Sequence, residues 1–153
     1  MFRGLSDGQI DAKGRITIPA NYRTLIAEEA NGSLVVTIDT EERCLLLYPY
    51  PQWQIIEEKL ESLPTFQPAA RRIQRLLMGH ATELELDRQG RVLLPNLLRD
   101  YAELDKTVIL VGQGKKIEIW SEPLWEDARA TWLAESMDES QGGVPMELAG
   151  LSL

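Results

Sequence analysis

An internal repeat constrains the fold of this chain more than any other feature of its sequence. Residues 10–19 read IDAKGRITIP and residues 86–95 read LDRQGRVLLP, so Asp, Gly, Arg and Pro recur at matching positions. Farther along, residues 44–53 match residues 116–125, and both blocks hold an apolar run, a proline and a tryptophan. The second copy is shortened near residues 28–32, which read as a loop where deletions cost little. Duplication predicts two similar halves that complete one fold.

Each copy has the pattern of two strands, a short helix, two more strands and a longer helix, or ββαββα. Gly14 and Gly90 suit a tight turn between the first two strands, because glycine accepts positive φ, and Asp11 can cap that turn. Pro19 and Pro95 then end a strand and open a helix. The remaining expectations are helices at 20–29 and 96–103, strands at 34–38, 45–48, 107–111 and 117–120, turns at 39–43 and 112–115, and helices of about ten residues from near Gln52 and Glu122.

The copies are joined by a further predicted helix at residues 69–78, after a break at 64–68 and before a capping Gly79. We therefore divide the chain into a first repeat with its linking helix at 1–76, a second repeat at 77–137 and a tail at 138–153. The tail is expected to be mobile or to dock on a neighbouring subunit through Met146, Leu148, Leu151 and Leu153.

The charge and cysteine content restrict the class of protein. A formal net charge of -8 speaks against nucleic acid, but screening acts over roughly 8 Å, so local charge decides. The single cysteine, Cys44, excludes an intramolecular disulfide and suits a reducing cytoplasm. We expect a cytoplasmic protein, since the sequence shows neither a signal peptide nor an apolar run of about 20 residues.

A single Asp-x-x-Gly-Arg turn is most simply a hairpin whose arginine pairs with the aspartate or faces solvent. Two copies favour a pseudo-twofold β-barrel in which strands of both copies interleave and cover each other's edges. Paired basic turns on one face would suit a DNA duplex, with arginine reading guanine and lysine contacting phosphate. The expected DNA-binding residues are Arg3, Lys13, Gly14, Arg15, Arg88, Gly90 and Arg91, with Asp11 and Asp87 as structural residues of the motif and Arg23 and Arg99 possible extensions of the basic face.

Taken together, several motifs resemble the MraZ family over residues 1 to about 125. They are the opening MFRG, the doubled Asp-x-x-Gly-Arg, CLLLYP at 44–49, the Arg71-Arg72-x-x-Arg75-Leu76-Leu77-x-Gly79 helix and Glu118-x-Trp120. The resemblance implies an α+β fold, a swapped-hairpin barrel of the AbrB type with flanking helices.

For function, the resemblance implies a ring-shaped homo-oligomer, associated with the nucleoid, that represses the division and cell-wall gene cluster by binding direct repeats in double-stranded DNA upstream of it. The second copy has Gln89 at the position of Lys13, and its basic residue Arg88 lies one position earlier in the turn. We therefore expect the first copy to contribute more to DNA recognition.

Two other functions stay open. Asp11 and Asp87 could hold a metal for phosphodiester cleavage, although the extra carboxylates of such sites are missing, and an AbrB-like barrel could serve as a protein-interaction or antitoxin-type module. We expect no enzyme, cofactor, metal or small-molecule ligand, since His80 is the only histidine and Cys44 reads as a core residue. The basic helix residues Arg71, Arg72 and Arg75 could contact phosphates, face solvent or pair with a neighbouring subunit.

Overall fold

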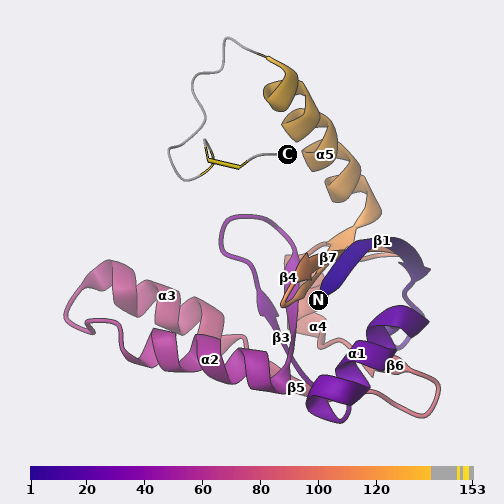
Figure 1. Cartoon of the computed structure of the whole chain (residues 1–153), viewed down its shortest axis with the longest axis horizontal. Helices are drawn as coiled ribbons and strands as arrows, with labels where there is room; N and C mark the ends of the chain where they lie inside the picture. The colour runs from indigo at the N-terminus through magenta and orange to yellow at the C-terminus, as the bar shows by residue number, and fades with distance from the viewer. Residues whose placement is uncertain (139–147, 149, 152–153) are drawn as a thin grey trace. The chain divides into compact units, whose positions relative to one another are not determined.

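A computed structural model of the chain describes residues 1–138, 148, 150 and 151 (Figure 1). Residues Met1–Glu122 form one compact unit and Pro123–Leu153 form another. Of the tail positions expected to dock, Leu148 and Leu151 are exposed, whereas Met146 and Leu153 lie outside the described residues. Among the described helices, none is both long enough and apolar enough to cross a membrane.

The elements follow the predicted order twice, with α3 between the copies. They are β1 (Phe2–Gln9), β2 (Arg15–Thr17), α1 (Ala20–Ala30), β3 (Ser33–Ile38), β4 (Leu45–Pro49), α2 (Tyr50–Glu61), α3 (Pro68–Gly79), β5 (Thr82–Glu85), β6 (Arg91–Leu93), α4 (Asn96–Tyr101), β7 (Thr107–Gly114), β8 (Ile117–Ser121) and α5 (Glu122–Met137). The fold is therefore α+β, as predicted.

Strands of the two copies are interleaved. The six-stranded antiparallel sheet has the order β1-β7-β8-β4-β3-β5, so β1 of the first copy pairs with β7 of the second, and β5 of the second pairs with β3 of the first. The short strands β2 and β6 pair with each other as a separate two-stranded sheet, here called the β2/β6 ribbon. The described pairings do not close the sheet into a ring of strands, so the barrel stays a prediction.

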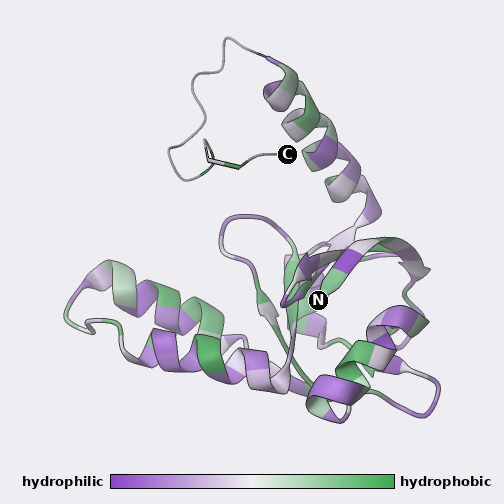
Figure 2. Cartoon of the chain, viewed as in Figure 1, coloured by the Kyte–Doolittle hydropathy of each residue, from purple (hydrophilic) through white to green (hydrophobic). Residues whose placement is uncertain are grey.

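Alternation along the strands builds the cores. In β4 and β8 the odd-numbered residues Leu45, Leu47, Ile117 and Ile119 enter the main core, which also receives Ile16 and Val92 from the ribbon. The opposite face of the sheet packs on α2 and α3 around a smaller core, whose buried members are Val35, Leu46, Tyr48, Trp53 and Leu60. In Figure 2 the loop before β6 is hydrophilic, which leaves it available to a polar partner.

Several predicted boundaries are wrong, each for a physical reason. Strand β7 extends into the expected turn at 112–115 and ends at Gly114, because β1 pairs with it up to that residue. Helix α5 has 16 residues instead of about ten, since its only proline lies in the first turn and no glycine interrupts it. Helix α4 ends at Tyr101, two residues before Glu103, which has a positive φ of 55°. Gly79 is the last residue of α3, and the cap is His80 with φ −93°.

Candidate nucleic-acid interface

Each repeated motif forms a turn closed by its aspartate. In the first copy, Oδ1 of Asp11 accepts hydrogen bonds from the backbone N–H groups of Lys13 at 3.0 Å and Arg15 at 2.8 Å. The backbone N–H of Gly14, which has a φ of 92°, donates to the carbonyl of Asp11 at 3.0 Å. Glycine is required there because L side chains rarely adopt this φ.

The second turn repeats these bonds. Oδ1 of Asp87 accepts from the backbone N–H groups of Gln89 at 2.9 Å and Arg91 at 2.8 Å. Gly90, with a φ of 76°, donates to the carbonyl of Asp87 at 3.0 Å. The two turns therefore share one geometry, in which the aspartate accepts from two backbone N–H groups and the glycine has a positive φ.

The same aspartates hold the motif arginines by a single nitrogen. Nε of Arg15 donates to Oδ2 of Asp11 at 2.7 Å, and Nε of Arg91 donates to Oδ2 of Asp87 at 2.9 Å. The arginine side chains are each 29% exposed. Bonding through Nε orients the guanidinium and leaves its outer nitrogens to face a ligand.

The copies differ at those outer nitrogens. Nη2 of Arg91 donates to Oε1 of Gln89 at 3.4 Å. Within the described part of the chain, no hydrogen bond from the outer nitrogens of Arg15 is found, and Lys13 stands where the second copy has Gln89. The first copy therefore presents the less engaged guanidinium.

Hydrogen bonding keeps both carboxylates ionised. The hydrogen bond from the backbone N–H of Arg15 is the main reason that the pKa of Asp11 is lowered from 3.8 to about 2. Partial desolvation acts in the opposite direction, and the guanidinium of Arg15 lowers the pKa further. The backbone N–H of Arg91, with the same two further contributions, lowers the pKa of Asp87. Both aspartates are therefore charged at neutral pH and can hold their arginines there.

The two turns are also joined across the copies. The backbone N–H of Leu94 donates to the carbonyl of Gly14, and that of Ile18 donates to the carbonyl of Gly90, both at 2.9 Å. Arg99 packs over Gly14 so closely that a Cβ there would lie 2.5 Å from the arginine Cζ. Arg23 packs over Gly90 in the same way, where a Cβ would lie 2.3 Å from Nη1. Each turn thus lies against an arginine of the other copy.

The ribbon brings the two motif arginines onto one face. Its register places Arg15 opposite Leu93 and Thr17 opposite Arg91, so the arginines are diagonal neighbours, roughly 7–8 Å apart at the backbone. Lys13 and Arg88 are exposed in the turns beside it. Arg3 lies near the start of β1, and the six residues from there to Gln9 at its end span roughly 20 Å. Strand β1 therefore does not bring Arg3 close to the turn that follows it.

Sequence reasoning named Arg23 and Arg99 only as possible extensions of the basic face. Their exchange between copies was missed, although their identical spacing from Arg15 and Arg91 is a usable signal. Arg71, Arg72 and Arg75 lie exposed on α3, on the side of that helix away from its buried Ala70. His80 ends the same helix, where its Nδ1 hydrogen bonds the carbonyl of Leu76 at 2.7 Å.

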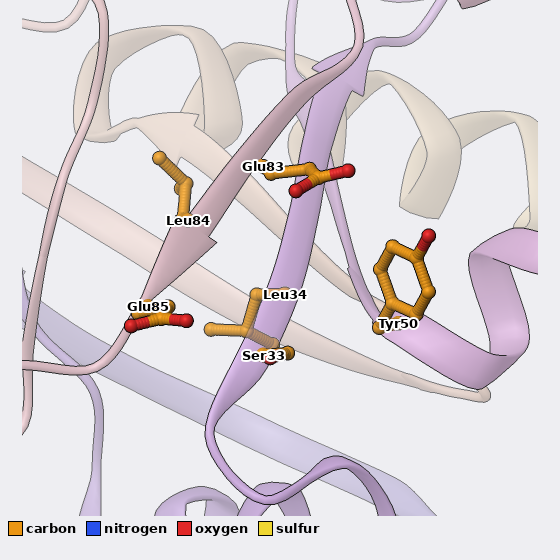
Figure 3. Close-up of a pocket in the computed structure, with 6 residues that line it drawn as sticks. All are labelled: Ser33, Leu34, Tyr50, Glu83, Leu84 and Glu85. Carbon is orange, nitrogen blue, oxygen red and sulfur yellow. The ribbon is translucent and has the colours of Figure 1, made fainter.

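One cavity lies away from these residues. It has a volume of about 370 Å³ and lies where β3 and β5 pair beside the start of α2 (Figure 3). Its lining is Ser33, Leu34, Tyr50, Glu83, Leu84 and Glu85. Two carboxylates make it unsuited to phosphate.

One buried group has the composition of a metal site. The ligating atoms of Asp39, Cys44 and Glu118 lie within 4.8 Å of one another. Burial first, and then the neighbouring carboxylates, raise the pKa of the Cys44 thiol, which donates to Oδ2 of Asp39 at 3.6 Å. Nε1 of Trp120 donates to Oε1 of Glu118 at 3.0 Å. The polar groups of Cys44, Asp39 and Glu118 are already hydrogen bonded to one another or to Trp120, so we assign this group no ion and no chemistry.

Both repeats, and the chain as a whole, are similar to known proteins. Residues 1–76 and 77–142 each match the family described as "MraZ protein, putative antitoxin-like". The chain is 62% identical over 153 residues to a protein of Coxiella burnetii (strain RSA 493 / Nine Mile phase I) named "Transcriptional regulator MraZ", with 100% of both chains covered. A protein of the same name from Legionella pneumophila (strain Paris) is 56% identical, and the match covers 100% of both chains. Another from Marinomonas sp. (strain MWYL1) is 50% identical, and the match covers 97% of this chain and 99% of that protein.

Proposed function

We propose a function from one premise: the chain belongs to the MraZ family. It is a transcriptional regulator that binds double-stranded DNA through the β2/β6 ribbon and the turns that precede its two strands. The name of the relatives supports regulation of transcription. The observation that carries DNA binding is the pair of aspartate-oriented arginines, Arg15 and Arg91, on one face of the ribbon.

Catalysis is not part of this proposal, because the relatives are named as regulators and not as enzymes. The geometry of the aspartates also opposes a metal-dependent nuclease. Each carboxylate already accepts three hydrogen bonds from its own turn, which a cation would have to displace. We infer that Asp11 and Asp87 position arginine and do not ligate metal.

We assign different roles to the basic residues of the turns. Arg15 has both outer nitrogens available for the bidentate contact that arginine makes to guanine, whereas Arg91 would exchange its bond to Gln89 for that contact. Lys13 and Arg88, at the exposed tips, are placed to contact phosphates, while Gly14 and Gly90 let the backbone turn closely. Arg3 is a peripheral phosphate contact at most.

The assembly we propose is a ring-shaped homo-oligomer of swapped-hairpin barrels. Each barrel is completed within one chain by the repeats at 1–76 and 77–137, with 138–153 as a tail. Several turns around one ring would meet direct repeats upstream of the division and cell-wall gene cluster at high effective concentration, and so repress it. The protein would act in the cytoplasm at the nucleoid, without a small-molecule ligand.

The site assignment is tested by equilibrium binding to the duplex upstream of the division and cell-wall gene cluster at about 0.15 M salt. Loss of one bidentate arginine contact costs roughly 1–3 kcal/mol per copy, and a ring multiplies that loss, so Arg15→Ala should abolish specific binding. Arg91→Ala should weaken it less, because Nη2 of Arg91 is already partly engaged by Gln89.

Two matched variants complete this test. Arg15→Lys keeps the charge but lacks the planar fork, so it should retain binding to any duplex while losing preference for the upstream one. Arg129→Ala removes an exposed arginine of α5, outside the proposed interface, and should bind as the wild type does. Upstream DNA bound equally by wild type, Arg15→Ala and Arg91→Ala would refute the assignment.

The multivalent assembly needs its own experiment. In a band-shift titration, removing the direct repeats one at a time should lower the affinity at each step. An affinity independent of the number of repeats would oppose the ring as a DNA-reading device.

A second function is favoured by the description of the family as putative antitoxin-like. In that case the fold would serve mainly to bind a protein partner. The variant Arg15→Ala separates the regulator from the protein-interaction module. Loss of binding to the upstream DNA, with oligomer mass and melting temperature unchanged, would favour the regulator, because a module that only binds protein would not need Arg15 to bind DNA.

A further inference from the structure

We propose that the outer face of the β2/β6 ribbon reads bases directly, and that Leu93 is a specificity-determining residue which contacts a thymine methyl group beside the guanine bound by Arg15. The inference rests on the proposed function and assigns a recognition role to a residue outside the Asp-x-x-Gly-Arg motif.

The register of the ribbon defines this outer face. Ile16 and Val92 are opposite each other and 1% exposed, so they point into the core. Their neighbours must point the other way, because successive side chains in a strand alternate. The outer face therefore consists of two cross-strand pairs, Arg15 with Leu93 and Thr17 with Arg91.

Leu93 is an exposed leucine between two core residues. The residue is 55% exposed, whereas its neighbours Val92 and Leu94 are 1% and 0% exposed. The equivalent residue of the first copy is Thr17, also exposed, so the fold does not require an apolar residue at this position. An exposed leucine next to an oriented arginine is complementary to a binding partner that has an apolar group beside a hydrogen-bond acceptor.

The dimensions of the ribbon match those of the DNA major groove. A two-stranded β-ribbon fits into that groove, where thymine exposes a methyl group and guanine exposes two acceptors. Arg15 and Thr17 are two residues apart and so about 6.8 Å apart along the strand, close to two base-pair steps of about 3.4 Å. Cross-strand partners lie about 5 Å apart, within reach of adjacent bases. The four outer residues thus cover about three base pairs.

The inequality of the two copies has a consequence for the DNA sequence. A ribbon with identical halves would favour a site that reads the same on both strands, since its pseudo-twofold axis passes between Ile16 and Val92. Leu93 opposite Arg15 and Thr17 opposite Arg91 make the halves different. A ribbon with unequal halves would prefer DNA sites in one orientation, as in direct repeats, which all have the same orientation.

The experiment selects preferred duplexes from a random 20-base-pair library with wild-type protein and with Leu93→Thr. Wild type should select a directional sequence containing thymine next to guanine. Leu93→Thr gives both cross-strand pairs the same composition, so its selected sequence should lose that thymine and become more symmetric. Leu93→Met, which keeps an apolar side chain, should select the wild-type sequence.

The methyl contact is then tested on the selected duplex by replacing each thymine with deoxyuridine, one at a time. One replacement should weaken wild-type binding about fourfold, the value of one buried methyl-sized group. The same replacement should not affect Leu93→Thr. Leu5→Thr is the matched control, because Leu5 is a strand leucine of equal exposure, 56%, outside the ribbon, and it should behave as the wild type.

The outcomes distinguish this inference from the function on which it rests. A selected sequence shared by wild type and Leu93→Thr, with no effect of deoxyuridine at any position, would overturn the role of Leu93 and leave sequence-specific binding standing. Failure of the wild type to select any sequence would overturn both. Melting of Leu93→Thr at the wild-type temperature shows that the ribbon has kept its fold.

Discussion

Asp11 uses both of its carboxylate oxygens within its own turn, and that arrangement decides where Arg15 points. One oxygen binds two backbone N–H groups and the other binds Nε of Arg15. These roles could be predicted from the sequence, because each follows from the local chemistry of Asp, Gly and Arg. The packing of Arg99 over Gly14 could not, since the two residues are brought together only by the exchange of strands between copies.

Substituting Gly14 should destabilise the protein. Gly14→Ala places a Cβ at a φ of 92° and 2.5 Å from Cζ of Arg99, so we expect the free energy of unfolding to fall by roughly 1–3 kcal/mol. Gly79→Ala is the matched control, because Gly79 is helical and a Cβ there meets nothing within 4 Å. It should be neutral or stabilising by up to about 1 kcal/mol. Urea denaturation of both variants checks this, and equal stabilities would contradict it.

The pairing of Asp11 also predicts a dependence on pH. Its pKa in the folded chain is about 2, below the ordinary 3.8, so it stabilises the fold fully above about pH 4 and loses that contribution as pH falls through about 2. Asp11→Asn should therefore be less stable than wild type at pH 7, and the difference should shrink as the pH falls from about 4 through about 2. A difference that persists unchanged at pH 2 in denaturant titrations would contradict the assigned bonds.

At the scale of elements, local patterns located the strands and helices better than they located their ends. Helix α1 was expected at 20–29 and spans Ala20–Ala30, because its proline and its apolar spacing are local signals. Strand β7 was expected to stop at Val111 but reaches Gly114, because its length is set by pairing with β1 from the other end of the chain. Pairing partners far apart in sequence leave no mark on local periodicity.

The ribbon depends on core packing, since three residues per strand cannot hold it by backbone bonds alone. Ile16→Ala should therefore lower the free energy of unfolding by roughly 2–5 kcal/mol, because Ile16 is 1% exposed. Thr17→Ala, one residue along on the outer face, should change it by less than about 0.5 kcal/mol. Thermal melting of both variants tests the two-faced ribbon, which comparable losses would rule out.

At the scale of the whole molecule, an acidic chain gathers basic side chains at the ribbon and its turns. The net charge is -8, yet the ribbon and its turns gather Lys13, Arg15, Arg23, Arg88, Arg91 and Arg99. The carboxylates of the turns, Asp11 and Asp87, are paired with the motif arginines. Local clustering of this kind was expected from the sequence, but the interleaving that creates it was recognised only in outline, because one repeat does not reveal which strands of the other it will pair with.

The proposed ring predicts a closed assembly. Native mass measurement should give one oligomeric mass that stays constant over a wide range of protein concentration, because a closed ring leaves no unsatisfied interface. A monomer, or a series of masses that lengthens with concentration, would exclude the ring while leaving the ribbon as the DNA-binding element of each chain.

The central claim is that DNA lies against the β2/β6 ribbon and its two turns, and hydrogen–deuterium exchange of the unmodified protein with and without its upstream duplex tests it most directly. At about 0.15 M salt we predict that DNA slows exchange at residues 11–18 and 87–94 more than anywhere else in the chain. Slower exchange confined to other segments, such as α2 and α3, with both of these unchanged, would contradict it.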